Sequence, residues 1–225
     1  PSIYNTLSFL EEMGFEITYL KVDGKGHVDL EQLKRSMRPD TILVSVMYVN
    51  NEVGAVEPVE EIGKIVHGVN PSAVFHVDAI QAYGKFLIRP KKQGIDLLSV
   101  SGHKLHGPKG IGFLYIDEHV KIRPIIYGGG QQRGMRSGTE NVPGIVGMGV
   151  AAEEAYTDFE EKAGHLCRLK DHMLERLGEL ERAYPHSYPG HALAHHHVRV
   201  SFSARSSELL PHPLVAPRIR RASLS

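Results

Sequence analysis

Two hydrophobic patterns alternate along the first 120 residues of the chain. Short apolar runs are separated by stretches in which apolar residues recur every three or four positions. Residues 41–49 (TILVSVMYV) form a nearly continuous apolar run, which is typical of a parallel strand covered on both faces. Repeated alternation of strand and helix patterns predicts an α/β architecture. The predicted strands are 15–22, 41–49, 73–77, 95–99, 112–116 and 198–203, and the predicted helices are 5–13, 28–37 and one opened by Pro58.

The second half of the chain has a different character. Residues 144–182 are mostly helical in pattern, and their leucines and Met173 predict a stripe that faces the core. Residues 183–225 are rich in histidine and proline, and after Pro211 the sequence has no periodicity and ends basic, which predicts a disordered tail. The apolar stripe consists of Leu166, Leu169, Met173, Leu177 and Leu180.

Composition and charge exclude several classes of protein. Lys+Arg and Asp+Glu both number 26, so a formal net charge of zero gives no basic field for nucleic acid. The apolar runs are too short to cross a bilayer, so no membrane span is predicted. The single cysteine, Cys167, excludes an internal disulfide framework and a cysteine-cluster metal site, and we predict no metal site. We expect a cytoplasmic protein.

Polar side chains follow three of the predicted strands at the points where the strands end. In an open α/β sheet, ligands bind at the carboxyl ends of the strands. The three polar groups are therefore expected to converge on one site. The residues concerned are Asn51 after the strand at 41–49, Asp78 and Gln81 after the strand at 73–77, and Ser101, His103 and Lys104 after the strand at 95–99.

Lys104 has two interpretations. From its position alone it is a surface charge, as most lysines are. The alternative is a partly desolvated amine that attacks an aldehyde to form a Schiff base. Its surroundings favour the second interpretation, because Ser101 and His103 can donate to a phosphate and Asp78 is the carboxylate that a pyridine nitrogen needs. His76 stays open between a role in the site and a hydrogen-bonded residue within its strand.

The glycine-rich run at 127–144 (YGGGQQRGMRSGTENVPG) is neither a Walker loop nor a dinucleotide fingerprint. A flexible loop is one interpretation. The other is an anion-binding segment, because Arg133, Arg136 and Thr139 stand among the glycines. Thr139 also lies just ahead of a predicted helix, where phosphate is favoured.

Three long motifs resemble one family. HVDAIQAYGK (76–85), DLLSVSGHKLHGPKGIGFLY (96–115) and GGGQQRGMRSGTENVPGIVGMG (128–149) closely resemble the cysteine desulfurases of the NifS/IscS type. These are class V members of the fold-type I pyridoxal-phosphate aminotransferase superfamily, and the resemblance covers roughly residues 1–180. It implies a truncated large domain with a mixed, mostly parallel sheet flanked by helices. Residues 1–145 would be its cofactor-binding part, 146–182 a helical connection, and 183–225 a remnant of the small domain.

The resemblance implies a role for each candidate residue around the cofactor ring. Lys104 would carry pyridoxal 5′-phosphate as a Schiff base and later move the Cα proton. Asp78 would pair with the pyridine nitrogen. Gln81 and Asn51 would hydrogen-bond the phenolic oxygen and its surroundings.

The phosphate end of the cofactor is assigned in the same way. Ser101 and His103 would hold the phosphate, and Thr139 would reach the phosphate of the neighbouring subunit in the family homodimer. The reaction implied is conversion of L-cysteine to alanine with a persulfide left on an enzyme cysteine. An iron–sulfur scaffold would then be a possible sulfur acceptor.

The sequence also departs from the family. The family's sulfur-accepting cysteine follows the strand that VRVSFS resembles, but no cysteine follows Cys167, which is expected to be a small hydrophobic residue of a helix. The ring-stacking histidine and the substrate-binding arginine of the family have no match in this chain. We therefore expect little or no desulfurase turnover from the chain alone. A related class V lyase, such as a selenocysteine lyase, and a non-catalytic fragment remain as alternatives.

Overall fold

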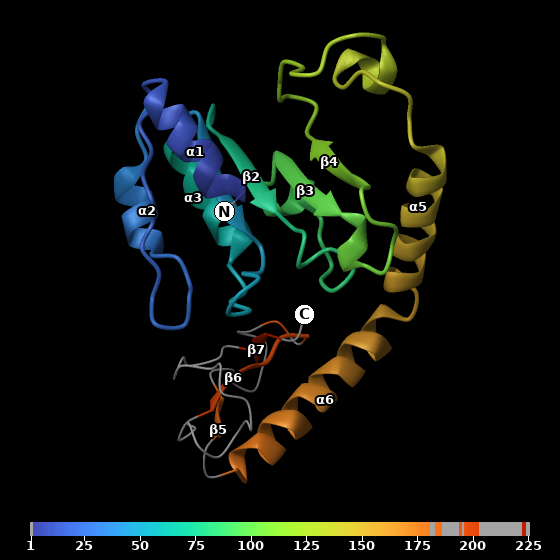
Figure 1. Cartoon of the computed structure of the whole chain (residues 1–225). Coiled ribbons are helices and arrows are strands. Elements are labelled where there is room, and N and C mark those ends of the chain that lie inside the picture. Colours follow the sequence, from blue (N-terminus) through green and yellow to red (C-terminus); the bar gives the residue numbers. More distant parts are fainter. Residues whose placement is uncertain (1, 181–182, 186–193, 195, 203–221, 224–225) are drawn as a thin grey trace, which may run out of the picture.

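The computed structural model describes residues 2–180, 183–185, 194, 196–202 and 222–223, and it contains two β-sheets connected by two long helices (Figure 1). The first sheet has the order β1-β2-β3-β4 and the second has the order β5-β6-β7. The helices are α1 Ser2–Glu12, α2 Leu30–Ser36, α3 Val59–Val69, α4 Pro90–Gln93, α5 Val142–Tyr156 and α6 Phe159–Gly178, with short 3₁₀ turns at Gly102–Lys104 and Gln131–Gly134. The strands are β1 Leu43–Met47, β2 Val74–Asp78, β3 Leu97–Ser101, β4 Gly112–Ile116, β5 Ala183–Pro185, β6 Arg199–Phe202 and β7 Ala222–Ser223.

The first sheet is mixed and mostly parallel. Strands β1, β2 and β3 are parallel, and β4 runs antiparallel to β3. The register places Met47 opposite Asp78, and Asp78 opposite Ser99, so the carboxyl ends of three strands share one edge. The α/β architecture expected from the alternating patterns is therefore confirmed, and the polar residues after these strands begin from the same side of the sheet.

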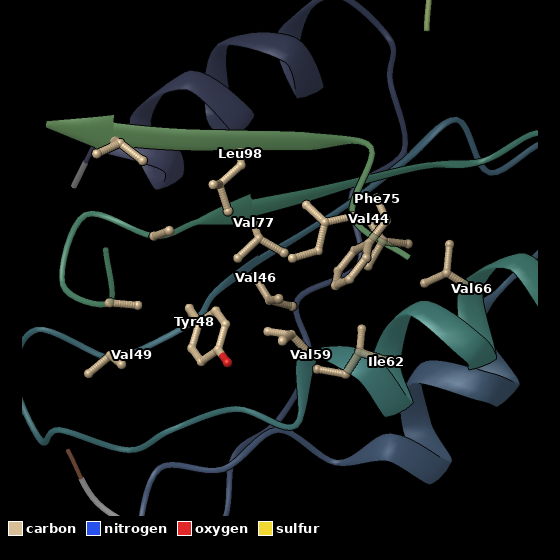
Figure 2. Packing of buried hydrophobic residues seen from close by; sticks show 14 of the residues in the cluster. Val44, Val46, Tyr48, Val49, Val59, Ile62, Val66, Phe75, Val77 and Leu98 are labelled. Carbon is tan, nitrogen blue, oxygen red and sulfur yellow. The ribbon is translucent and has the colours of Figure 1, made fainter. Parts of the chain in front are cut away.

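The core lies between one face of this sheet and α3. Phe75 and Val77 of β2 are fully buried and face Ile62 and Val66 of α3, which are also fully buried (Figure 2). Alternate residues of a strand point to opposite faces, so the neighbours of these core residues must point away from α3. His76 is one of them, and the opposite face of the sheet is consequently polar at its centre.

The segment at 15–22 does not form the predicted strand. Among the described residues its one ladder contact is an isolated bridge between Val22 and Val28. Phe15, Tyr19 and Val22 are 45%, 44% and 58% exposed. β-branched and aromatic residues favour a strand, but a strand also needs a partner. Among the described residues β1 pairs with β2 alone, so the segment at 15–22 adds no strand to the sheet. The local pattern was therefore misleading here.

The predicted apolar stripe of α6 does not face the core. Leu166, Leu169, Met173 and Leu180 are between 36% and 52% exposed, whereas Leu174 is buried. Figure 1 shows the reason: α6 runs away from the four-stranded sheet toward β5, and the contacts support this arrangement. Periodicity revealed the helix correctly but could not reveal which surface would meet it.

The C-terminal region is only partly described. Ala222–Ser223 pair with β6, and the rest of the predicted disordered tail lies outside the described residues. In the described part of the chain, no helix combines the length and apolar character required to cross a membrane.

Acid is expected to weaken the structure at the end of β4. The Tyr115 hydroxyl donates to Asp117 at 2.8 Å, and His119 Nδ1 lies 2.7 Å from the same carboxylate. These two hydrogen bonds lower the pKa of Asp117 from 3.8 to about 2. Because the folded-state pKa is depressed, the stabilisation is present above about pH 4 and is lost as the pH falls toward 2. The stability difference between wild type and Asp117→Asn should therefore shrink over this interval in denaturant titrations. The exposed Glu161→Gln is the control, and an unchanged difference would contradict the assignment.

Candidate active site

A cleft of about 1290 Å³ is lined by α1, the segment at 14–22 and β1, and it reaches the carboxyl edge of the sheet. Four residues expected at the site from the sequence line it: Asn51, Asp78, Gln81 and Lys104. They come from three different strand ends, which the parallel register brings together. The convergence expected from the strand-end rule thus occurs for these four side chains.

Asp78 is the last residue of β2 and points its carboxylate in a defined direction. Its Oδ1 accepts the backbone N–H of Ile80 at 3.0 Å, which is a turn that aspartate favours after a strand. Within the described residues, no other hydrogen bond engages this carboxylate. The carboxylate can therefore accept a hydrogen bond from a protonated nitrogen of a ligand in the cleft.

Lys104 stands at the end of the 3₁₀ turn that follows β3. The Gly102 carbonyl accepts the N–H groups of both Leu105 and Gly107, at 3.1 and 2.9 Å, and Leu105 is buried as an anchor. A Cβ on Gly102 would lie 3.0 Å from the Ile111 side chain, so the tight turn favours glycine there. Lys104 itself is partly buried, and it is the one lysine among the described residues that line the cleft.

The two amides differ in their surroundings. Gln81 is 7% exposed, and in the described part of the chain its side-chain amide forms no hydrogen bond. Asn51 is exposed and donates to the Glu52 carboxylate at 3.1 Å. The Gln81 amide is not among the buried polar atoms that lack a partner, so it still reaches the open cleft, where it can bind a polar ligand group.

Three other predicted residues do not line the cleft. Ser101 Oγ and His103 Nδ1 hydrogen-bond each other at 2.7 Å, next to Lys104 in the chain. Thr139 is exposed in the loop before α5. The phosphate-binding roles of these residues stay predictions.

Lys85 is a charged residue near the site to which sequence reasoning gave no role. Burial, and then the charge of Lys104, lower the pKa of Lys85 from 10.5 to about 8. Among the described residues no carboxylate forms an ion pair with it. Its place in the motif HVDAIQAYGK was a signal, but its burial could not be read from the sequence.

His76 proves to be hydrogen-bonded within the sheet. Its Nδ1 and Nε2 each lie 2.8 Å from a hydroxyl, that of Ser45 on β1 and that of Ser99 on β3. Burial lowers the pKa of His76, and the neighbouring Asp78 partly opposes this effect. The ring therefore links three neighbouring strands, in agreement with the structural interpretation that the sequence had left open.

The cleft fits pyridoxal phosphate by the chemistry of its donors. The cofactor carries an aldehyde, a ring nitrogen and a phenolic oxygen. Lys104 supplies an amine, Asp78 a carboxylate with free acceptor capacity, and Gln81 an unpaired amide. The fit rests on the chemistry of this set of donors and acceptors at one cleft.

Comparisons with known proteins agree with this chemistry. The family model described as aminotransferase class-V matches residues 2–213. A cysteine desulfurase IscS of Methanosarcina thermophila is 45% identical over 209 residues, which are 93% of this chain and 51% of that protein. A solved NifS-like protein aligns with a TM-score of 0.85 at 43% identity, over 89% of this chain and 54% of its own.

A further solved structure, described as SspA in complex with cysteine, aligns with a TM-score of 0.73 at 35% identity, over 89% of this chain and 55% of that one. The chain spans about half the length of the relatives that it matches. These matches confirm the resemblance inferred from the three motifs. The chain belongs to the aminotransferase class-V family, and its similar relatives are cysteine desulfurases and NifS-like proteins.

Proposed function

We propose that this chain is the cofactor-binding part of a pyridoxal-phosphate-dependent cysteine desulfurase. The observation that carries the proposal is the meeting of Lys104, Asp78 and Gln81 at one cleft. The desulfurase relatives support the choice of reaction, and the structure of SspA with cysteine supports L-cysteine as the substrate class. The products would be L-alanine and a sulfur atom held as a persulfide.

Each cleft residue has a task in this proposal. Bound pyridoxal phosphate supplies an electron-withdrawing ring that stabilises negative charge at the substrate Cα. Asp78 would hold the proton on the ring nitrogen, and Gln81 would donate to the phenolic oxygen. Lys104 Nζ would bind the cofactor, and its amine would also serve as the base that holds the proton taken from the substrate Cα.

The remaining predicted residues would act at the phosphate and across a homodimer. Ser101 and His103 would hold the phosphate, and Thr139 would reach the phosphate of a second copy. Large apolar side chains are exposed on the segment that precedes Thr139 in the sequence: Ile125 is 90% exposed and Tyr127 is 78% exposed. Large apolar side chains in open solvent favour an interface with another chain.

Sulfur acceptance is not assigned to a residue of this chain. Cys167 is the one cysteine in the sequence, lies partly buried on α6, and is not among the cleft-lining residues. We therefore propose little turnover for the chain alone. An iron–sulfur scaffold as sulfur acceptor and a cytoplasmic location are part of the proposal.

Reductive trapping tests cofactor binding directly. The chain is incubated with pyridoxal phosphate, reduced with sodium borohydride, digested and mapped by mass spectrometry. We expect one dominant phosphopyridoxyl group on Lys104, because that amine lines the cleft. Label on Lys85 instead, or spread evenly over exposed lysines such as Lys64 and Lys109, would contradict the proposed function.

A further inference from the structure

The turn that presents Asn51 to the cleft is built from residues 50–54. The Asn50 side chain accepts the N–H groups of Glu52 and Val53 at 2.9 and 3.0 Å. The Asn50 carbonyl accepts the Gly54 N–H at 2.9 Å, which closes the turn. These bonds shape the turn internally, but they do not attach its outer side to the rest of the protein.

The attachment comes from a segment 140 to 145 residues further along the sequence. Ala194 N–H donates to the Gly54 carbonyl at 2.8 Å, and His197 Nε2 lies 3.1 Å from the Glu52 carbonyl. A carbonyl only accepts, so His197 must carry its proton on Nε2. On the other side, Lys170 of α6 donates to the Ala194 carbonyl at 3.2 Å. Two backbone carbonyls on the turn are thus bonded to a segment that α6 holds in place.

Packing reinforces these bonds. His197 is 4% exposed and Ala194 is fully buried. The His197 ring lies directly on Gly54, where an added Cβ would come within 2.9 Å of its Cβ, Cγ and Cδ2 atoms. Gly54 has a φ of +75°, so both its backbone conformation and its contact with the ring require glycine.

We propose that His197 is a positioning residue that fixes the 50–54 turn and thereby holds Asn51 at the cleft. Its consequence for cofactor binding rests on the proposed function, whereas its effect on the turn does not. His197 would act through the Glu52 carbonyl, one residue beyond Asn51, and through its contact with Gly54. Among the described residues the Asn51 side chain forms one hydrogen bond, with the exposed Glu52 carboxylate, which is too weak an anchor to define its place.

The electrostatic surroundings agree with a neutral ring. Burial lowers the pKa of His197, the bond to the Glu52 carbonyl opposes this, and the charge of Lys170 lowers the pKa further. The charged groups that face the ring are Lys170 of α6, Glu52 of the turn and Arg199 of β6. The His197 ring therefore donates to the Glu52 carbonyl as a neutral imidazole. Glutamine is the matching conservative replacement, because its amide donates a hydrogen bond without titrating.

Hydrogen exchange measured by mass spectrometry on the 225-residue chain without cofactor tests the proposal. In His197→Ala, amides of residues 50–55 should exchange about tenfold faster, the size expected for losing one buried hydrogen bond. Amides of β3 should keep their wild-type rates. His197→Gln should restore most of the protection, and His165→Ala, on an exposed position of α6, should match wild type.

Two results would overturn the inference. One is wild-type exchange of residues 50–55 in His197→Ala. The other is faster exchange of β3 together with the turn in both His197 variants, which would make His197 a residue of general stability. Because no cofactor is present, neither outcome depends on the proposed function.

A double-mutant cycle then links the turn to the cofactor. Asn51→Ala and His197→Ala should each weaken pyridoxal phosphate binding, and the double variant should bind no more weakly than Asn51→Ala alone. Fully additive losses would show that His197 does not act through Asn51. A wild-type chain that binds no pyridoxal phosphate would instead overturn the proposed function and leave the exchange result standing.

Discussion

Replacing Lys104 by alanine is expected to abolish the visible absorption band that forms when the chain is reconstituted with pyridoxal phosphate. The band requires a covalent link between the cofactor aldehyde and an amine, and Lys104 is the one lysine among the described cleft-lining residues. Cofactor held without that link should be lost on gel filtration. The measurement is the absorbance spectrum before and after desalting, at a pH near 8.

Lys109→Ala is the matched control for this prediction. Lys109 is exposed and lies five residues further along the same segment, outside the cleft. It should therefore retain the full band. Lys85→Ala adds a second comparison, because burial and Lys104 bring the pKa of Lys85 to about 8, so a fraction of this amine is also nucleophilic. A band that survives Lys104→Ala but disappears in Lys85→Ala would show that Lys85 forms the covalent link, and it would contradict the prediction for Lys104.

The largest effect on stability is expected for Phe75→Ala. Phe75 is fully buried, with 0% of its surface accessible to solvent, and it packs between the sheet and α3 (Figure 2). Removing a buried phenyl ring loses its transfer free energy and leaves a cavity, so unfolding should become easier by about 3–5 kcal/mol. Urea titration followed by circular dichroism measures the change.

The control for this prediction is Phe9→Ala on α1, where the ring is 59% exposed. Its unfolding free energy should stay within about 1 kcal/mol of wild type. A loss below about 1 kcal/mol for Phe75→Ala would show that the interface between the sheet and α3 is not the main core. A large loss of stability would also affect the site, because Phe75 and Asp78 belong to the same strand, β2. The Phe75 amide also ties this strand to the buried Asp96, to which it donates at 2.7 Å.

Much of the candidate site could be predicted because a parallel sheet imposes a simple geometric rule. The strands of such a sheet end at one edge, so polar residues after successive strands meet there whatever the details of packing. Asn51, Asp78, Gln81 and Lys104 followed that rule. Periodicity also revealed α3, α5 and α6, because a helix is specified mainly by local spacing.

Other features depended on contacts between residues distant in sequence. The segment at 15–22 has the composition of a strand, but in the described chain it forms only the isolated bridge from Val22 to Val28, and composition does not show whether a partner strand exists. The leucines of α6 have helical spacing, yet their exposure depends on where the helix lies relative to the sheet. Neither property is encoded in a window of neighbouring residues.

The sequence by itself determined the α/β class, the family, and the identity of the amine and carboxylate at the cleft, because each of these depends on local pattern or on motif. Only the tertiary structure decided which side chains are buried and what they touch. It placed Lys85 in surroundings that lower its pKa, enclosed His76 between two serine hydroxyls, and set His197 against the turn of Asn51 across 145 residues of sequence from Glu52. The physical reason is that desolvation and hydrogen bonding act through space, and folding alone brings those groups together.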